Sequence, residues 1–182
     1  GLADRVHFRT IGLSKAIAAR GGIVAGSRRN MEFFRYEAFP MIFSTSVLAY
    51  EIAGFEKTLD IINHETWRRD RLHHNHTYLR DGLLGLGYDV GECDSQIIAI
   101  IAGSNPDTII LRDYLAANGI YGSVFAPPAT AEGAALVRFT VNAELKQDDL
   151  DRVLSVFSKA RYELDLNCVP RLNAYGAYHA AE

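Results

Sequence analysis

The chain has 182 residues, 48% of them apolar, and carries a formal net charge of −3. A chain of this length can bury a substantial core, either as one domain or as two small lobes. The charge balance offers no basic face for nucleic acid, and no apolar run reaches the roughly 20 residues that cross a bilayer, so we expect neither nucleic-acid binding nor membrane insertion. The start, "GLADRVHFRT", has neither an initiating Met nor a signal-peptide pattern. We therefore expect a cytoplasmic protein of which this chain is a part.

Strand and helix patterns follow one another from the start of the chain. Alternation in "RVHFRTI" (5–11) predicts a strand that leads into a turn at Lys15. The glycine-bounded run "GGIVAGS" (21–27) predicts a second strand. Residues 28–38 suit a short helix that Pro40 ends, because proline cannot continue a helix from within.

A long helical pattern occupies the middle of the chain. After a brief extended segment predicted for "MIFSTS" (41–46), apolar residues recur at spacings of three and four from Leu48 to Leu86. The pattern ends at Gly87, where the periodicity changes, and we place the boundary between two lobes there.

The remainder of the chain alternates between strands and helices. The expected elements are a strand at 96–102, a helix at 106–118, strands at 120–125 and 135–142, and a helix at 147–162. Pro106 and Asp107 favour a helix start, and Gly119 favours a helix end. This order predicts a small α/β lobe with helices on one face of a short sheet, followed by an irregular tail at 167–182.

The histidines and cysteines form no recognised metal or redox pattern. His73 and His76 could bind a metal at two points of one helix face, but no nearby Cys completes the set and arginines flank it. A solvated or packed helix face is favoured, and we predict no metal site. Cys93 and Cys168 lie far apart and are expected to be free thiols.

Lys15 is surrounded by small residues in "GLSKAIAARGG" (12–22). A lysine that forms an imine with an aldehyde cofactor must be reached by a flat ring, and small neighbours leave the space for it. The hydroxyl cluster at 44–46 could serve the phosphate of such a cofactor. Taken alone, the same pattern also fits a helix start with a solvated lysine.

The order of "SKAIAARGG", "MIFSTS" and "ALVRFTVNAEL" resembles the α-oxoamine synthases. The resemblance implies the C-terminal part of a fold-type I α/β transferase that depends on pyridoxal phosphate. Residues 1–87 would belong to the large domain and residues 88–182 would form the small domain. Such enzymes join an amino acid to an acyl-coenzyme A and release coenzyme A and usually carbon dioxide.

One segment narrows the resemblance within the family. The stretch "SQIIAIIAGSNPDTIILRDYLAANGIYGSVFAPPAT" is most similar to quorum-sensing autoinducer synthases, which make α-aminoketones or hydroxyketones. The alternatives are another α-oxoamine synthase, of the 8-amino-7-oxononanoate synthase or 2-amino-3-ketobutyrate ligase type, and an assembly module without catalysis of its own.

The resemblance also implies roles for single residues. Lys15 would hold the cofactor as an imine and take the α-proton of the amino acid, and Ser14 would help to bind the phosphate. Ser44 and Thr45 would reach the cofactor phosphate of a neighbouring subunit, so that a homodimer shares its active sites. Arg138 would grip the substrate carboxylate. Without the resemblance, the simpler interpretations are a helix cap at Ser44 and Thr45 and an arginine at a strand edge paired with an acid.

Two features depart from the family pattern. Gly12 stands where the family commonly has a phosphate-binding Thr or Ser, and Thr10 lies too far back along the strand to replace it. The family's chains are considerably longer, and neither the aspartate at the pyridine nitrogen nor the aromatic residue stacked on the ring has a candidate here. We therefore predict that this chain alone is inactive.

Overall fold

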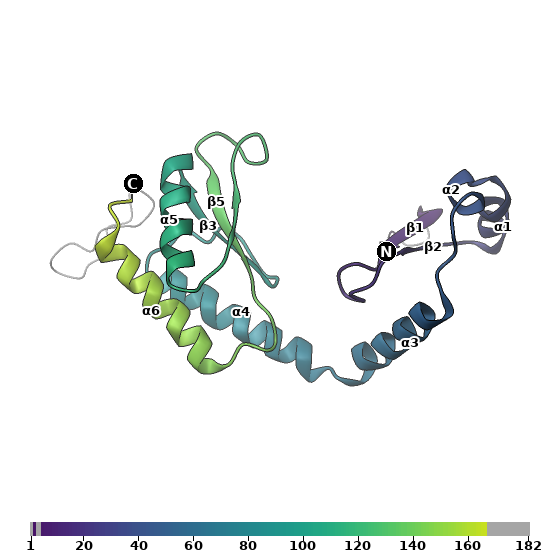
Figure 1. Cartoon of the computed structure of the whole chain (residues 1–182), viewed down its shortest axis with the longest axis horizontal. Coiled ribbons are helices and arrows are strands. Elements are labelled where there is room, and N and C mark those ends of the chain that lie inside the picture. Colours follow the sequence, from purple (N-terminus) through teal and green to yellow (C-terminus); the bar gives the residue numbers. More distant parts are fainter. Residues whose placement is uncertain (1, 3–4, 167–182) are drawn as a thin grey trace. The chain divides into compact units, whose positions relative to one another are not determined.

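The computed structural model describes residues 2 and 5–166, which form two compact units, Gly1–Thr66 and Trp67–Glu182 (Figure 1). The tail predicted to be irregular, 167–182, lies outside the described residues. Within the described part of the chain, no helix is both long enough and apolar enough to cross a membrane.

The boundary between the units lies before helix α4 (Trp67–Gly85), not at Gly87 as the change of periodicity predicted. Helix α4 packs against elements of the second unit and therefore belongs to it. The continuous helical pattern is in fact two helices, because α3 (Ala49–His64) ends at Glu65, whose φ of −102° and ψ of 58° are not helical. No proline or glycine marks this break in the sequence.

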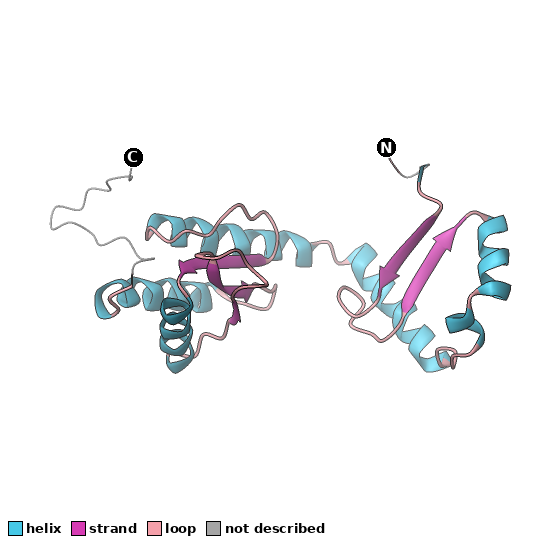
Figure 2. Ribbon diagram, turned by 90° about the horizontal axis from the view of Figure 1, so that it is seen from above, coloured by secondary structure: helices cyan, strands magenta, loops and turns pink. Residues whose placement is uncertain are grey.

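The first unit begins with the two predicted strands, which pair as a hairpin. Strand β1 (Phe8–Gly12) pairs antiparallel with β2 (Gly22–Gly26), with Phe8 opposite Gly26 and Gly12 opposite Gly22. Figure 2 shows the two strands side by side as an open ribbon. All residues of β1 are exposed, so the hairpin is held by its ladder of hydrogen bonds more than by burial.

Two further helices of the first unit correct one prediction. Helix α1 (Arg28–Glu37) begins after Ser27, whose hydroxyl accepts the Asn30 N–H at 3.2 Å, and ends before Pro40 as predicted. Residues 41 and 42, however, lie in a short helix α2 (Phe39–Ile42) and not in an extended segment. Pro40 stands in the first turn of α2, where its missing N–H costs no hydrogen bond, so it ends one helix and opens the next.

The second unit adds a three-stranded antiparallel sheet to helix α4. Its further elements are β3 (Ile97–Gly103), α5 (Asn105–Ala117), β4 (Ser123–Phe125), β5 (Ala135–Thr140) and α6 (Gln147–Glu163). Strand β5 is the central strand, between β3 and β4. Every predicted element of this lobe is present, although β4 is shorter than the predicted 120–125. The predicted start of α5 is also confirmed, since Ser104 caps it and Pro106 lies in its first turn.

One face of this sheet carries the core. Ile98 and Ile100 of β3 and Val137 of β5 are almost fully buried. Arg138, the residue after Val137 on β5, is exposed. The buried residues that the helices contribute to this hydrophobic cluster are Leu79, Leu83, Leu111, Leu115, Leu150, Val156 and Phe157. Alternation along the strands therefore sends one set of side chains to the helices and the other to the open face of the sheet, as predicted.

Candidate active site

The loop that carries Lys15 is closed at its base by Leu13. The Leu13 N–H donates to the Gly21 carbonyl at 3.1 Å, and the Leu13 carbonyl accepts the Ala19 N–H at 3.1 Å. The Leu13 side chain is buried, with 4% exposed, which fixes the end of the loop to the body of the unit. Inside the loop the Ala18 N–H donates to the Lys15 carbonyl at 3.1 Å, and Ala18 takes a left-handed φ of 53°. This loop conformation is unusual for a residue other than glycine and indicates a defined turn.

The Lys15 side chain is exposed on this turn, beside the small residues Ser14 and Ala16. Its amine forms no hydrogen bond or ion pair with any residue that the structure describes, so it is available to a ligand. Gly12, which precedes the turn, also faces free space, because a Cβ built there would meet no heavy atom within 4 Å. The surroundings of Lys15 thus have room for a flat ring, and the residue types fit an imine-forming cofactor.

Ser44 and Thr45 lie in the exposed segment between α2 and α3 of the same unit. They do not cap a helix, since α3 begins after Leu48, whose N–H donates to the Glu51 carboxylate at 2.8 Å. The first turn of α3 lies beside the Lys15 loop, because Glu51 forms an ion pair with Arg20 at 3.8 Å. The two hydroxyls form no hydrogen bond among residues 5–166 and remain free to bind a phosphate.

Arg138 belongs to the second unit and is described within it alone. It stands on the open face of the sheet, opposite Ala99 of β3 and Ser123 of β4. The interpretation as an edge arginine paired with an acid is wrong, because β5 is the central strand and no described carboxylate pairs with Arg138. Its guanidinium carbon lies 4.2 Å from the centre of the Phe125 ring. This aromatic contact was not predicted, because nothing in the sequence aligned 123–125 with 136–138.

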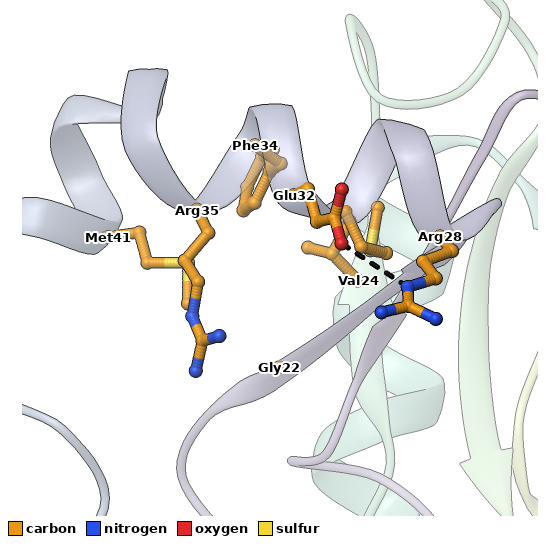
Figure 3. A pocket seen from close by; sticks show the side chains of 8 residues that line it. Gly22, Val24, Arg28, Glu32, Phe34, Arg35 and Met41 are labelled. Atoms are coloured by element: carbon orange, nitrogen blue, oxygen red, sulfur yellow. Dashed lines mark hydrogen bonds and ion pairs between the residues drawn. The ribbon is translucent and has the colours of Figure 1, made fainter.

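A cavity of about 540 Å³ in the first unit is separate from these residues. It lies between β2 and α1 and is lined by apolar side chains including Val24, Phe34 and Met41 (Figure 3). Arg28 and Glu32 form an ion pair of 3.3 Å at its rim. Neither Lys15 nor the hydroxyl residues line this cavity, so its size alone does not make it the candidate site.

Among the histidines of α4, His76 lies on a packed helix face, whereas His73 and His74 are exposed. His76 is buried, with 2% exposed, on the same stripe as Leu79 and Leu83. Burial is the main cause that lowers the pKa of His76 below 6.5, and the charges of Arg80 and His73 act in the same direction. Neither ring nitrogen makes a well-formed hydrogen bond within the described chain, although the backbone of Cys93 lies close by.

The described residues contain no group of three side chains that could hold a metal ion. Cys93 is a free thiol, whose pKa burial raises, while Cys168 lies outside the described residues.

Comparison with known proteins identifies the family. The aminotransferase class I and II family matches residues 1–157. The CAI-1 autoinducer synthase of Vibrio campbellii is 36% identical over 159 residues, which are 87% of this chain and 40% of the relative. The 8-amino-7-oxononanoate synthase of Symbiobacterium thermophilum is also 36% identical, over 91% of this chain and 42% of the relative.

A solved structure of Sphingomonas wittichii serine palmitoyltransferase has a TM-score of 0.81 and 27% identity, and it matches 89% of this chain and 41% of its own length. The chain thus spans less than half the length of these relatives. The resemblance to the α-oxoamine synthases and the fold-type I α/β architecture are confirmed. This chain, with Lys15 exposed on a turn and Arg138 on the exposed face of a sheet, belongs to the aminotransferase class I and II family.

Proposed function

We propose that the chain is part of an α-oxoamine synthase that binds pyridoxal 5'-phosphate and transfers an acyl group from acyl-coenzyme A to an amino acid. The observation that carries this proposal is the free amine of Lys15, on a turn of small residues, within a stretch similar to oxoamine synthases. The relatives are more than twice as long as the matched region. The acyltransferase activity proposed here is therefore that of the whole protein.

Lys15 would hold the cofactor through an imine, because its amine is exposed and its neighbours leave room for a ring. Ser14 would contribute to phosphate binding from the same turn. When bound, the cofactor supplies an electron sink for the bond that is broken at the α-carbon of the amino acid. Lys15, once the amino group of the substrate has displaced its Nζ from the cofactor, would accept the α-proton of the amino acid.

Arg138 would bind the carboxylate of the amino acid. It is a central-strand arginine without a described acidic partner, and its planar guanidinium can donate two parallel hydrogen bonds to a carboxylate. Such a two-point contact fixes the orientation of the amino acid, which a single ammonium group cannot do as well.

Ser44 and Thr45 would bind the cofactor phosphate of a second subunit, so we propose a homodimer with shared active sites. Their exposure and their lack of partners among the described residues support this role. We further propose that the chain comprises the end of the large domain followed by the small domain, and that the protein is cytoplasmic.

The finer proposal is a quorum-sensing autoinducer synthase, supported by the similarity to the CAI-1 autoinducer synthase. The equal identity to an 8-amino-7-oxononanoate synthase makes a different α-oxoamine product the alternative. A panel of acyl-coenzyme A donors of increasing length separates the two, with the product identified by mass spectrometry. A chain without any transferase activity in its full-length form would instead favour a non-catalytic assembly module.

The direct test of the function is covalent trapping of the cofactor. Borohydride reduction of the full-length gene product loaded with pyridoxal phosphate should fix the cofactor, and peptide mapping should locate it on Lys15. Lys15→Ala should lose both the trapped label and the visible imine absorbance, whereas Lys57→Ala, at an exposed position of α3, should keep them. A label on another lysine with normal absorbance in Lys15→Ala would overturn the assignment.

A further inference from the structure

Phe125 holds the guanidinium of Arg138 against its ring. The two residues lie on neighbouring strands, where Ser123 is opposite Arg138 and Phe125 is opposite Leu136. Phe125 is thus the diagonal neighbour of Arg138 on the same face of the sheet, a position within reach of an aromatic side chain. The guanidinium carbon lies 4.2 Å from the ring centre, which is the geometry of a cation–π contact.

The N–H donors of the Arg138 guanidinium have no partner among the residues that the structure describes. A guanidinium that lies on a ring face contacts the ring through its plane, while its five N–H groups point outward within that plane. No described carboxylate or carbonyl occupies these donors. An acidic partner would also hold Arg138 in place, but it would use the donors that a substrate carboxylate needs.

We propose that Phe125 is a positioning residue for Arg138: its ring fixes the guanidinium so that the free edge can take the carboxylate of the substrate. This inference rests on the proposed function of Arg138. The aromatic contact restricts the side chain before the substrate binds, so less side-chain freedom is lost when the carboxylate is bound. Phe125 touches the arginine and not the reacting atoms, and its effect falls on binding of the amino acid.

A simpler role for Phe125 would be apolar cover for the sheet, since the residue is half-buried and lies opposite Leu136. The two roles predict different results for leucine. Leucine keeps the apolar cover but has no ring face for the guanidinium, whereas tyrosine keeps the ring face.

The experiment uses the full-length gene product with Phe125→Leu, Phe125→Tyr and Arg138→Ala, and with Tyr162→Leu as an aromatic-to-leucine control on an exposed position of α6. The dissociation constant of the amino acid is measured without acyl donor, together with KM and kcat. Phe125→Leu should weaken amino-acid binding about 3- to 30-fold with kcat and the KM of the acyl donor little changed. Phe125→Tyr should restore binding to within about twofold, and Tyr162→Leu should have no effect.

A second readout does not depend on activity. The rate at which phenylglyoxal modifies Arg138, followed by peptide mapping, should rise in Phe125→Leu and stay low in Phe125→Tyr, because the ring shields one face of the guanidinium. If Phe125→Leu does not fold, Phe125→Ile provides the same loss of the ring with a residue that suits a strand.

The double variant separates the possible failures. In the Arg138→Ala background, Phe125→Leu should cause no further loss of amino-acid binding, since the two residues act as a unit. Unchanged binding in Arg138→Ala would refute the proposed role of the arginine itself. A clear loss in Arg138→Ala, together with unchanged binding and unchanged modification in Phe125→Leu, would overturn the positioning role alone.

Discussion

The two units each carry residues with a proposed function, and they are stabilised in different ways. Among the described residues, Leu13 is the sole buried apolar residue of the first unit, whereas the second unit has a continuous core. Large aromatic residues such as Phe33, Phe39 and Phe43 of the first unit are more than half exposed. Exposed apolar area of this kind marks a surface made for further contacts.

This difference bears on the two functional side chains. The Lys15 loop owes its shape to backbone hydrogen bonds and one buried leucine, so its order is expected to depend on contacts outside this unit. Arg138 stands on the central strand of a packed sheet and keeps its place through that core. Lys15 thus stands on a weakly supported loop in the first unit, whereas Arg138 stands on a well-packed sheet in the second unit.

The largest effect is expected from a test of whether Thr45 of one subunit serves the active site of the other subunit in a dimer. Lys15→Ala should be nearly inactive in the full-length gene product, and Thr45→Ala should lose much of its turnover when pyridoxal phosphate is limiting. Mixed under conditions in which subunits exchange, they should regain partial activity, because one of the two sites in each heterodimer keeps both groups. The measurement is turnover before and after mixing, with exchange followed by mass. Demonstrated exchange without recovered activity would rule out the shared site.

The next largest effect is a difference between the two units in how strongly truncation of a side chain lowers the free energy of unfolding. Leu83→Ala removes a side chain with 2% exposure from the core of the second unit and should cost about 2–5 kcal/mol of unfolding free energy. Ile11→Ala in β1, where the side chain is 53% exposed, should cost less than about 1 kcal/mol. Urea denaturation measures the loss of unfolding free energy in each variant, and hydrogen exchange shows which unit has lost stability. Equal losses at the two positions would mean that the first unit has a core of its own.

Arg138→Ala tests whether the second unit contributes to binding of the amino acid. Losing a charge-assisted pair with the substrate should lower kcat/KM for the amino acid about 30- to 1000-fold, or about 2–4 kcal/mol. Arg138→Lys should recover only part of it, because the two-point geometry is lost. Arg112→Ala is the matched control, since Arg112 pairs with its neighbour Asp113 on α5. A loss below about threefold would make Arg138 a structural residue.

The sequence predicts the second unit better than the first, and the reason is physical. Short strands and capped helices around one core produce clear alternation, so 96–102 and 135–142 differ from β3 and β5 by only a few residues at their ends. In the first unit, the break between His64 and Trp67 has no glycine or proline, and Pro40 opens a helix as readily as it ends one.

In the candidate site, too, the sequence predicts local features but not contacts between distant segments. The positions of Lys15 on a turn and of Arg138 facing away from Val137 and Phe139 follow from local patterns and are confirmed. The Phe125 ring on Arg138 could not be predicted, because it depends on the register between β4 and β5. Register is fixed by long-range packing and by the connecting loop, neither of which a local pattern contains.

A smaller effect is expected at the loop of the first unit. Gly12 has open space where a side chain would point, so Gly12→Thr should fit and place a hydroxyl near the proposed phosphate site. One added hydrogen bond should tighten binding of pyridoxal phosphate about 2- to 12-fold, equivalent to about 0.5–1.5 kcal/mol. Titration of the apo protein by absorbance measures it, with Gly12→Ala as the control that adds a Cβ but no hydroxyl. Equal affinities for both variants would place the phosphate elsewhere.

The smallest effect concerns a buried histidine in the core of the second unit. Because burial lowers the pKa of His76 below 6.5, the unfolded chain binds its proton more readily than the folded chain does. The contribution to stability is therefore fully present above pH 6.5 and is lost as the pH falls through the folded-state pKa. Arg80 and His73 act in the same sense, while Asp94 and the Cys93 backbone oppose them.

His76→Phe keeps an aromatic ring in the core without a titrating group, so the free energy of unfolding should lose this part of its pH dependence. The measurement is urea denaturation at several pH values above and below 6.5, with His73→Gln as the control at an exposed position of the same helix. His73→Gln removes one neighbouring positive charge and should flatten the dependence only slightly. If the pH dependence in His76→Phe equals that of the unchanged protein, then His76 accepts a proton in the folded state, and the core of the second unit is open to water at this point.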